Sequence, residues 1–347
     1  MYIRHMISLS DRIEAFHALG NRLSAFINEP NSEQNSSIKA DINLAFHKNG
    51  WFDEREVMHA IGYWAKALQK QNLQEWINNY DLAGSNAKKI AIVAAGNIPL
   101  VGFHDVLCIL LSGHRAMIKC SSSDDVLLPL FLDLLKAVEP RFENYIELIP
   151  FKLEGFDAVI ATGSNNSARH FQQYFGKYPS IIRKNRTGIA ILDGTETTDE
   201  LHGLIEDAYR YYGLGCRNIT KLYLPKDYDL NKIFEASVPF AYLMENKKFA
   251  NNYTYHKTLM MMESRPILEN ELLLLVENAS LYSPVSVLNY EYYTDIAQLN
   301  EKIEAELDHI QCVVSKTNTP FGMAQKPTIN QYADGVDTLM FLTNLAL

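Results

Sequence analysis

The run Lys88-Lys-Ile-Ala-Ile-Val-Ala94, followed by Ala95-Gly96-Asn97-Ile98-Pro99, decides the fold class of this 347-residue chain. Its apolar residues are continuous rather than alternating, which is typical of a strand buried on both faces of a parallel sheet. The glycine, asparagine and proline that follow it end the strand and turn the chain. A helical segment from Val101 to Leu111 comes next, so the order is that of an α/β domain.

Alternating strands and helices continue along the chain. Strands are expected at Ala116–Lys119, Tyr145–Ile149 and Asp157–Ala161, and helices from the Ser121–Asp125 cap to Val138 and over Ser167–Phe175. This alternation predicts a doubly wound sheet, in which ligands bind beyond the carboxyl ends of the strands. Unusual residues gather at those ends, at Gly96-Asn97, Lys119-Cys-Ser-Ser122 and Thr162-Gly-Ser164. Taken singly, each of these segments also fits an ordinary turn, strand end or helix cap.

The composition indicates a globular protein that does not bind nucleic acid. The apolar fraction is 47%, and a net charge of −9 gives no basic field to attract phosphate backbones. The four cysteines are scattered without a C-x-x-C pair, so neither a zinc framework nor a disulfide scaffold is expected, and we expect no metal. Met1–Ile7 lacks the apolar core of a signal peptide, and Pro129 interrupts the run Leu127–Leu132. We therefore expect a cytoplasmic protein with no membrane span.

A second stretch with chemical potential is Tyr209-Arg-Tyr-Tyr-Gly-Leu-Gly-Cys-Arg-Asn218, which lies between a helix-like run and the strand-like Thr220–Leu224. Its two glycines allow a sharp turn and a close approach to a ligand. A thiol on such a turn becomes a nucleophile where backbone N–H groups, a helix terminus or a cation such as Arg217 lowers its pKa. Otherwise it is inert packing. The stretch alone supports both interpretations of Cys216.

Other parts of the chain have simpler patterns. Helices are expected from Ser8, over Ile38–His47, around Val57–Leu68 and over Asp295–Leu307. Thr258–Met262 is interpreted as a buried strand and Glu269–Val276 as a helix. Neither standard phosphate motif, G-x-G-x-x-G or G-x-x-x-x-G-K-[ST], follows the first strand, which disfavours an ordinary Rossmann dehydrogenase or a P-loop enzyme.

Taken in order, the unusual segments resemble those of the aldehyde dehydrogenase superfamily. The matching segments are Gly96–Pro99, Lys119-Cys120-Ser121 in place of Lys-Pro-Ser, Thr162-Gly163-Ser164, Gly213-Leu-Gly-Cys216, Tyr282-Ser-Pro-Val285 and Thr319-Pro-Phe-Gly322. No single piece is specific, but six in the family's order are. The resemblance covers about Lys88 to Leu347.

The resemblance is closest to the long-chain acyl-CoA reductases, the LuxC-like branch, because of Phe321–Gln325 and Tyr332–Phe341. Two departures from the wider family fit this branch. Arg183–Gly188 lacks the usual general-base glutamate, and Ser280 replaces a second glutamate. Oxidation of an aldehyde to an acid needs a base to activate water, whereas reduction of an acyl thioester does not.

The resemblance implies NADPH-dependent reduction of a fatty acyl-CoA to the aldehyde. Cys216 would attack the thioester and expel coenzyme A, giving an acyl-cysteine. The side-chain amide of Asn97 and the backbone N–H of Cys216 would stabilise the oxyanion. Lys119 would bind the adenosine ribose or its phosphate, with Ser121 and Ser122 nearby, and Gly163 and Ser164 would pack by the pyrophosphate. A cation with hydroxyl groups favours NADPH over NADH.

The implied fold is aldehyde dehydrogenase-like α/β, with a doubly wound nicotinamide-binding domain and a second α/β catalytic domain. The expected divisions are 1–187 for the amino-terminal helices and the cofactor domain, 188–316 for the catalytic domain, and 317–347 for a segment returning to the first domain. The family's dimer-building arm has no identifiable hairpin here. A homo-oligomer and an acyl-transferase or ligase partner both stay open.

Three alternative functions remain. The same fold could act on another activated acyl group, such as an acyl phosphate, or oxidise aldehydes. It could serve as a catalytically silent partner subunit, in which case Cys216 would be inert. A Cys–His hydrolase is disfavoured, since His202 lies a helix away from Cys216 in sequence and His256 has no evident tether to it.

Overall fold

The computed structural model describes residues 7–82 and 86–346, so residues 1–6 of the stretch considered for a signal peptide lie outside it. The chain forms two compact units, each described here by itself. One comprises Met1–Lys184 with Thr328–Leu347, and the other comprises Asn185–Pro327. Relative to the divisions expected from the sequence, residues 185–187 and 317–327 lie in the second unit.

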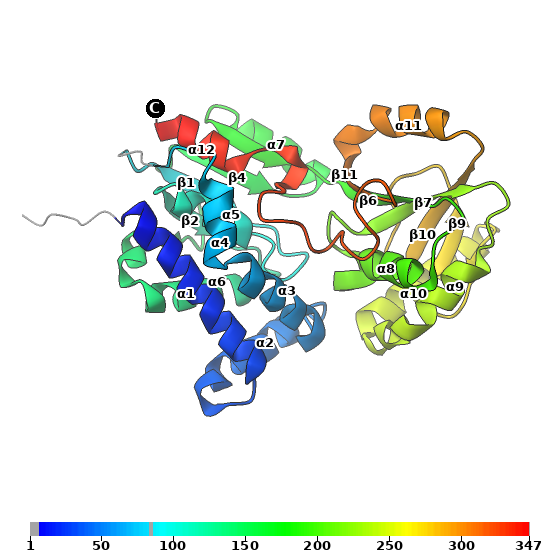
Figure 1. The fold of residues 1–347 in the computed structure, drawn as a ribbon, viewed down its shortest axis with the longest axis horizontal. Helices are drawn as coiled ribbons and strands as arrows, with labels where there is room; N and C mark the ends of the chain where they lie inside the picture. The colour runs from blue at the N-terminus through cyan, green and yellow to red at the C-terminus, as the bar shows by residue number, and fades with distance from the viewer. Residues whose placement is uncertain (1–6, 83–85, 347) are drawn as a thin grey trace, which may run out of the picture. The chain divides into compact units, whose positions relative to one another are not determined.

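The first unit is built on a parallel sheet (Figure 1). Its strands are β1 (Lys89–Val93), β2 (Arg115–Lys119), β3 (Ile146–Leu148), β4 (Ala158–Thr162) and β5 (Ser180–Arg183). They lie in the order β3-β2-β1-β4-β5, and every pair is parallel. This is the doubly wound order, and it reverses between β1 and β4. The predicted fold class is confirmed.

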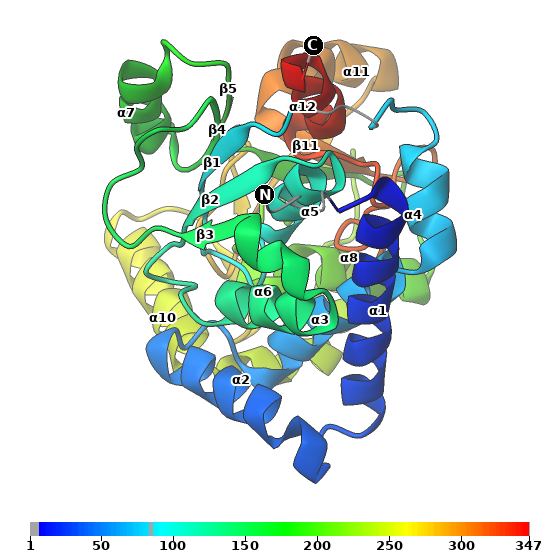
Figure 2. The same cartoon turned by 90° about the vertical axis from the view of Figure 1, so that its left-hand side faces the viewer.

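The first unit also contains helices, of which α5 (Phe103–Leu111) and α7 (Asn165–Phe175) pack directly on the sheet. The others are α1 (Leu9–Asn28), α2 (Ser36–Lys48), α3 (Glu54–Ala67), α4 (Lys70–Ile77), α6 (Leu127–Val138) and α12 (Thr338–Ala346), with 3₁₀ turns η1 (Glu33–Asn35), η2 (Pro140–Asn144) and η6 (Ala333–Gly335). Ser8 caps α1 as predicted, because its hydroxyl accepts the Asp11 N–H at 3.1 Å. Figure 2 shows α7 beside β4 and β5, whereas α5 packs on β1 and β2.

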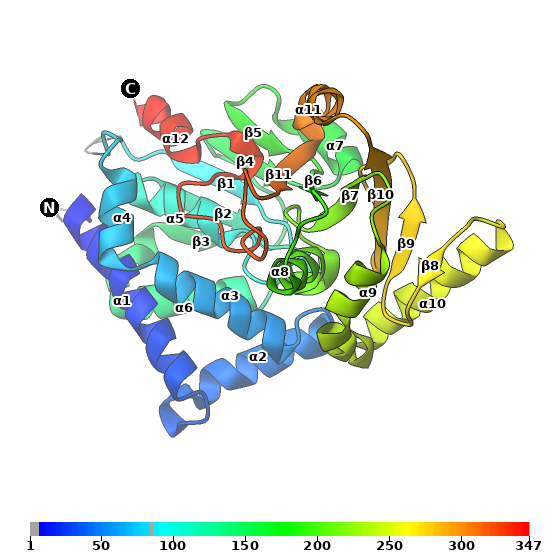
Figure 3. The ribbon, with the colours of Figure 1, turned by 45° about the vertical axis from the view of Figure 1, so that its right-hand side comes forward.

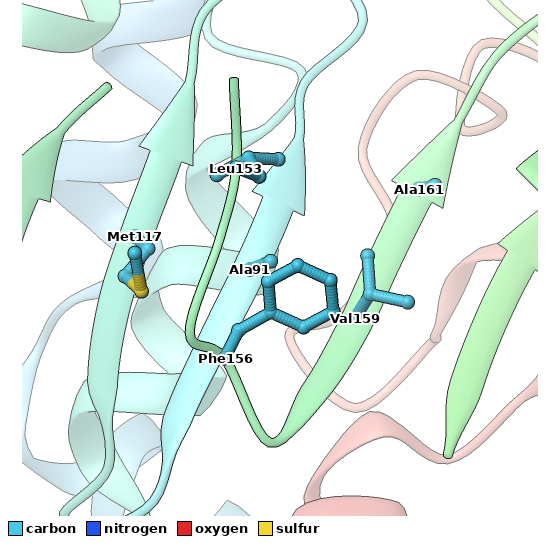
Figure 4. Packing of buried hydrophobic residues seen from close by; sticks show 6 residues of the cluster. All are labelled: Ala91, Met117, Leu153, Phe156, Val159 and Ala161. Atoms are coloured by element: carbon cyan, nitrogen blue, oxygen red, sulfur yellow. The ribbon is translucent and has the colours of Figure 1, made fainter. Parts of the chain in front are cut away.

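The connection from β3 to β4 contains no helix among its residues 149–157, all of which the structure describes. It instead lays Leu153 and Phe156 on the sheet, against Ala91, Met117 and Val159 (Figure 4). Burial of these side chains removes apolar surface from water at about 25 cal/mol per Å². A short connection thus covers part of one face of the first sheet.

The carboxyl-terminal segment completes the first unit. Helix α12 packs against α5, and the Leu342 carbonyl lies 3.0 Å from Nε2 of His114. Arg183, at the end of β5, donates to Asp105 of α5 and to Thr338 at 3.0 Å. All three of these side chains are buried, so the segment is joined to the unit by a hydrogen bond from the guanidinium of a buried ion pair.

The second unit has its own sheet, in the order β11-β6-β7-β10-β9-β8. Its strands are β6 (Thr187–Ile191), β7 (Ile219–Pro225), β8 (Leu268–Glu269), β9 (Leu274–Glu277), β10 (Val287–Tyr293) and β11 (Ile310–Val314). Every pair is parallel except β8 with β9. Figure 3 shows β7, β10, β9 and β8 following one another across this unit.

Helices pack on both faces of this second sheet. They are α8 (Thr198–Tyr209), α9 (Asn231–Ser237), α10 (Lys247–Met262) and α11 (Ile296–Ala305), with 3₁₀ turns η3 (Arg210–Gly213), η4 (Val238–Glu245) and η5 (Leu307–His309). Leu299 and Ile303 of α11 pack on Ile189 and Tyr223. Figure 1 shows α8 and α11 on opposite sides of the strands. Within residues 7–82 and 86–346, no helix combines the length and the apolar character that a bilayer span requires.

Two sequence interpretations in this unit are wrong. Thr258–Met262 is not a strand but the last part of α10, and Met261 and Met262 are exposed. Glu269–Val276 is not a helix, because Glu269 ends β8 and Leu274–Glu277 form β9. The side chain of Asn270 accepts the N–H groups of Leu272 and Leu273, and this local bond competes with helix formation.

Candidate active site

Cys216 lies on the loop between η3 and β7, at the amino end of the second sheet, and is half-buried. The backbone before it is unusual. Tyr211, Tyr212 and Gly213 have φ values of 55°, 57° and 77°, all in the left-handed region. For a residue with a side chain this conformation costs about 1–2 kcal/mol. The cost is met because both tyrosines are buried, with the Tyr212 ring 6.0 Å from that of Phe249 on α10.

Asn218 fixes the other end of the loop. Its Oδ1 accepts the Gly215 N–H at 2.7 Å, and its backbone N–H donates to the Gly215 carbonyl at 3.1 Å. Its Nδ2 donates to the carbonyls of Asp207 and Arg210, at 2.9 and 2.8 Å. Cys216 is thus within a turn whose two ends are joined by a fully buried amide. The carbonyls it satisfies include those left open where α8 ends.

The segment carrying Ser280 lies at the same edge of this sheet. Thr220, at the start of β7, donates its hydroxyl to the Leu281 carbonyl at 2.6 Å. Asn289 of the neighbouring strand β10 donates to the carbonyls of Ser280 and Tyr282, each at 3.0 Å. Ser280 is exposed and its hydroxyl donates to the Tyr282 carbonyl. A hydroxyl therefore stands at this position rather than a general base.

Asp207 joins the end of α8 to the segment that resembles the Pro-Phe-Gly turn. It is fully buried, and its carboxylate accepts the N–H groups of Gly322 and Ala324 at 2.7 and 2.9 Å. Burial raises its pKa to about 7. Arg217 donates its Nε to the Ala324 carbonyl at 2.5 Å. The cation that follows Cys216 in sequence is thus bound to the same turn.

In the first unit, the loops after β1 and β2 touch. A side chain on Gly96 would place its Cβ 2.7 Å from Cβ and Oγ of Ser121, so only glycine allows this approach. Asp124 stabilises both loops, because its carboxylate accepts the Leu100 N–H at 3.2 Å and the Leu127 N–H at 3.1 Å. Burial raises the pKa of Asp124 to about 6. The N-cap residue of α6 is Val126, which makes no side-chain cap bond, so the cap expected over Ser121–Asp125 is corrected: Asp124 accepts the first N–H of the helix from two positions before the N-cap.

Gly163 and Ser164 lie between β4 and α7. The hydroxyl of Ser164 caps α7 by accepting the Ser167 N–H at 3.2 Å. A Cβ on Gly163 would lie 2.8 Å from that of Ser167 and 2.9 Å from the Phe171 ring, so the strand end and the helix pack closely here. Ser164, which caps this helix, is exposed, and N–H groups at the start of a helix can bind an anion.

The structure brings six of the seven predicted site residues to one edge. Asn97 follows β1, Lys119, Ser121 and Ser122 lie at the end of β2, and Gly163 and Ser164 follow β4. These strands are neighbours in the sheet, and Asn97, Lys119, Ser122 and Ser164 are exposed. Cys216 belongs to the second unit.

The roles of Asp207 and Asn218 were not predicted from the sequence, whereas Asp124 lies in the stretch that was expected to cap the next helix. For Asp207 a signal existed, since a charged residue stands three positions after Leu204 on the apolar face of the expected helix. For Asn218 none existed, because its partners include carbonyls eight to eleven residues away.

The fold is that of solved aldehyde dehydrogenases. Aldehyde dehydrogenase 21 from Physcomitrella patens, in complex with its product succinate, is similar with a TM-score of 0.66 at 11% identity, over 99% of this chain and 85% of that one. An aldehyde dehydrogenase of Mycobacterium tuberculosis, complexed with NAD+, gives 0.63 at 12% identity, over 88% and 72%. An NADP-dependent enzyme of E. coli gives 0.62 at 11% identity, over 90% and 74%.

At the level of sequence, no curated protein is significantly similar to this chain. The family model for acyl-CoA reductase (LuxC) matches residues 66–248, more than half of the chain. That range contains both the strand ends of the first sheet and the Cys216 loop. The chain therefore belongs to the LuxC acyl-CoA reductase family.

Proposed function

We propose that this protein reduces an acyl-CoA thioester to the aldehyde, with Cys216 carrying the acyl group as a thioester. The observation that carries the proposal is the position of Cys216, half-buried on a loop fixed by Asn218, in a chain of this family. A loop held by left-handed residues and a buried amide keeps the thiol in one place. Such positioning lowers the barrier of a bimolecular attack.

In the first half-reaction, the Cys216 thiolate attacks the carbonyl carbon of the acyl-CoA. The new C–S bond forms as the bond to the coenzyme A sulfur breaks, and the coenzyme leaves as a thiolate. One thioester replaces another, so the step is nearly isoenergetic and depends on positioning. We propose that the amide of Asn97 and the backbone N–H of Cys216 donate to the oxyanion.

The edge formed by β1, β2 and β4 fits a nicotinamide nucleotide. Gly96 lets the loops after β1 and β2 pack closely against each other, and the capped start of α7, where helix N–H groups can meet an anion, lies at the same edge. Lys119, Ser121 and Ser122 would hold the adenosine ribose or its phosphate, and Gly163 and Ser164 would lie by the pyrophosphate. When bound, the reduced nicotinamide would supply the hydride that takes the acyl group to the aldehyde level.

The carboxylates near Lys119 favour NADPH over NADH as the reductant. Asp124 is buried and accepts N–H groups of its own chain, and Asp125 forms an ion pair with Lys48 at 3.0 Å. Both acidic groups are therefore engaged, whereas recognition of a free ribose 2′-hydroxyl uses an available carboxylate. The Lys119 side chain is exposed and would meet a 2′-phosphate.

Water is not a partner in this chemistry. The segment Arg183–Gly188 spans the end of β5 and the start of β6 without a glutamate, and Ser280 stands at the second customary position. With no carboxylate at either position to activate water, hydrolysis of the acyl group on Cys216 is slow, and transfer of hydride to it is favoured. An aldehyde product is favoured over an acid.

The test is turnover of the purified protein with acyl-CoA of several chain lengths and NADPH. We expect NADPH consumption with equimolar release of the coenzyme A thiol. Cys216→Ala should abolish both, whereas Cys108→Ala, which alters a buried cysteine of α5, should retain them. Turnover only with an acyl phosphate or an aldehyde would assign another reaction to the fold. No turnover with any substrate and an unreactive Cys216 would indicate a silent partner subunit.

A further inference from the structure

Two segments of the second unit that are far apart in sequence meet at one buried carboxylate. Asp207, near the end of α8, is 0% exposed and uses each of its oxygens once. Oδ2 accepts the Gly322 N–H at 2.7 Å, and Oδ1 accepts the Ala324 N–H at 2.9 Å. Both bonds go to the turn Pro320–Gln325, which we call the clamp turn.

The clamp turn lies directly against α8. A Cβ on Gly203 would be 2.8 Å from the Gly322 nitrogen and from the Phe321 carbonyl carbon, so no side chain fits between helix and turn. Gly322 itself has a φ of 80°, which glycine adopts without strain. The carboxylate of Asp207 therefore binds a turn that the backbone already holds at close range.

The clamp turn also binds the residue after the candidate nucleophile. The Ala324 carbonyl accepts Nε of Arg217 at 2.5 Å, and the Arg217 carbonyl accepts the Cys312 thiol at 3.5 Å. The network closes through the backbone of Asp207, whose carbonyl accepts Nδ2 of Asn218 at 2.9 Å. Arg217 and Asn218 are thus held from both sides.

We propose that Asp207 is a positioning residue for Cys216: its ionised carboxylate holds the clamp turn, and the turn holds Arg217 and so the orientation of the preceding thiol. The inference rests on the proposed function of Cys216. The inference adds that the geometry of the Cys216 thiol depends on the charge state of Asp207, a residue that contacts neither substrate nor cofactor in the proposed reaction.

Ionisation matters because both carboxylate oxygens face N–H donors. A protonated carboxyl keeps one good acceptor and presents a hydroxyl to the other donor, so the clamp weakens. Burial raises the pKa of Asp207 to about 7. The charged and titratable groups around it are Glu206 on its own helix, Lys326 beyond the clamp turn, and Arg217 and Cys312 on the facing segments. Arg210 is occupied by its ion pair with Glu206 at 3.1 Å.

The effects of pH on stability and on positioning have opposite signs. Because the folded-state pKa lies above the unfolded value of about 3.9, the contribution of Asp207 to stability is complete below that value and is lost as pH rises through about 7. As the pH rises through about 7, Asp207 loses its proton, and both of its carboxylate oxygens can then accept hydrogen bonds from the clamp turn. Asp207 is therefore ionised where it positions the loop, at the expense of folding stability.

The test compares the wild-type protein with Asp207→Asn, measuring the rate of alkylation of Cys216 by iodoacetamide between about pH 5.5 and 9. The asparagine places one donor against an N–H donor. We expect alkylation of Asp207→Asn at about pH 8 to be roughly tenfold slower than that of the wild type, since small displacements of reacting groups have large kinetic effects. Both rates follow the ionisation of the thiol itself, so the diagnostic quantity is their ratio, which should approach one as the pH falls below about 7. Leu299→Ala, which removes buried packing from α11 in the same unit, should keep the wild-type pH profile.

A second measurement needs no variant. Hydrogen exchange of the peptide covering residues 321–326 in the wild-type protein, corrected for intrinsic pH dependence, should show less protection at about pH 6 than at about pH 8. Unchanged protection, or an Asp207→Asn protein with the wild-type alkylation profile, would overturn the positioning role. Alkylation and exchange need no acyl substrate, so a protein that fails to accept acyl groups but keeps these pH effects would refute the proposed function alone.

Discussion

At position 218, one side-chain amide bonds to four backbone groups around the loop that carries Cys216. Oδ1 accepts from Gly215, and Nδ2 donates to the carbonyls of Asp207, Ala208 and Arg210. Asn218→Ala should lower the free energy of unfolding by about 2–3 kcal/mol, because buried carbonyls and an N–H lose their partner. Asn218→Asp should lower the free energy of unfolding further, since a carboxylate oxygen would face three carbonyl oxygens. Urea denaturation measures both, and an aspartate variant as stable as the wild type contradicts this account.

Substitution of Gly96 in the first unit is expected to affect the binding of NADPH rather than folding. Gly96→Ala places a Cβ 2.7 Å from Ser121, so the β1 and β2 loops must separate. We expect NADPH affinity to fall at least about tenfold, as when a binding site is displaced by a fraction of an ångström. Gly62→Ala on α3 is the matched control, because nothing lies within 4 Å of its Cβ. Equal affinities of the two variants in fluorescence titration would be the contrary outcome.

Strands β1, β2 and β4 were predictable from sequence because each is a short apolar run followed by a glycine or a serine cluster, and β3 because its run ends before Pro150. Those signals are local, and so is the hydroxyl cap at Ser8. Strand β5 was not predicted, since only two isoleucines stand between Ser180 and Arg183.

The run Thr258–Met262 was wrongly interpreted because five apolar residues fit both a buried strand and the end of a helix. The helix is recognised only when the preceding stretch Lys247–Lys257 is included, since both belong to α10. Bonds such as that from Gly322 to Asp207 span 115 positions and have no local pattern.

Strand β9 lies in the stretch Glu269–Val276 that was expected to be a helix, and its burial pattern tests the strand assignment. Leu274 and Leu275 point to opposite faces of the sheet, yet both are buried, at 0% and 1% exposure. Leu274→Ala and Leu275→Ala should therefore each lower the free energy of unfolding by about 2–5 kcal/mol. A helix or a half-exposed strand would give one large and one small loss. Denaturant titration of the two variants distinguishes these cases, and a marked asymmetry would oppose the strand.

For the whole molecule, the division into two units predicts that ligand effects are local. NADPH at about a hundred times its Kd should add about 2.7 kcal/mol to the stability of the state that binds it. Hydrogen exchange should then slow at the ends of β1, β2 and β4, whereas acylation should slow exchange over Arg210–Asn218. Protection by NADPH confined to the second unit would contradict the assignment of the first sheet to the cofactor.

The proposed reaction depends on transfer of an acyl group to Cys216, which mass spectrometry of the protein after incubation with acyl-CoA alone would detect. Without a reductant the acyl-enzyme has no hydride to consume it. We predict that the mass of the protein increases by that of one acyl group, that the added mass lies on the peptide containing Cys216, and that the mass of Cys216→Ala does not change. An adduct on another residue such as Cys120, or none at any acyl chain length, would contradict the account.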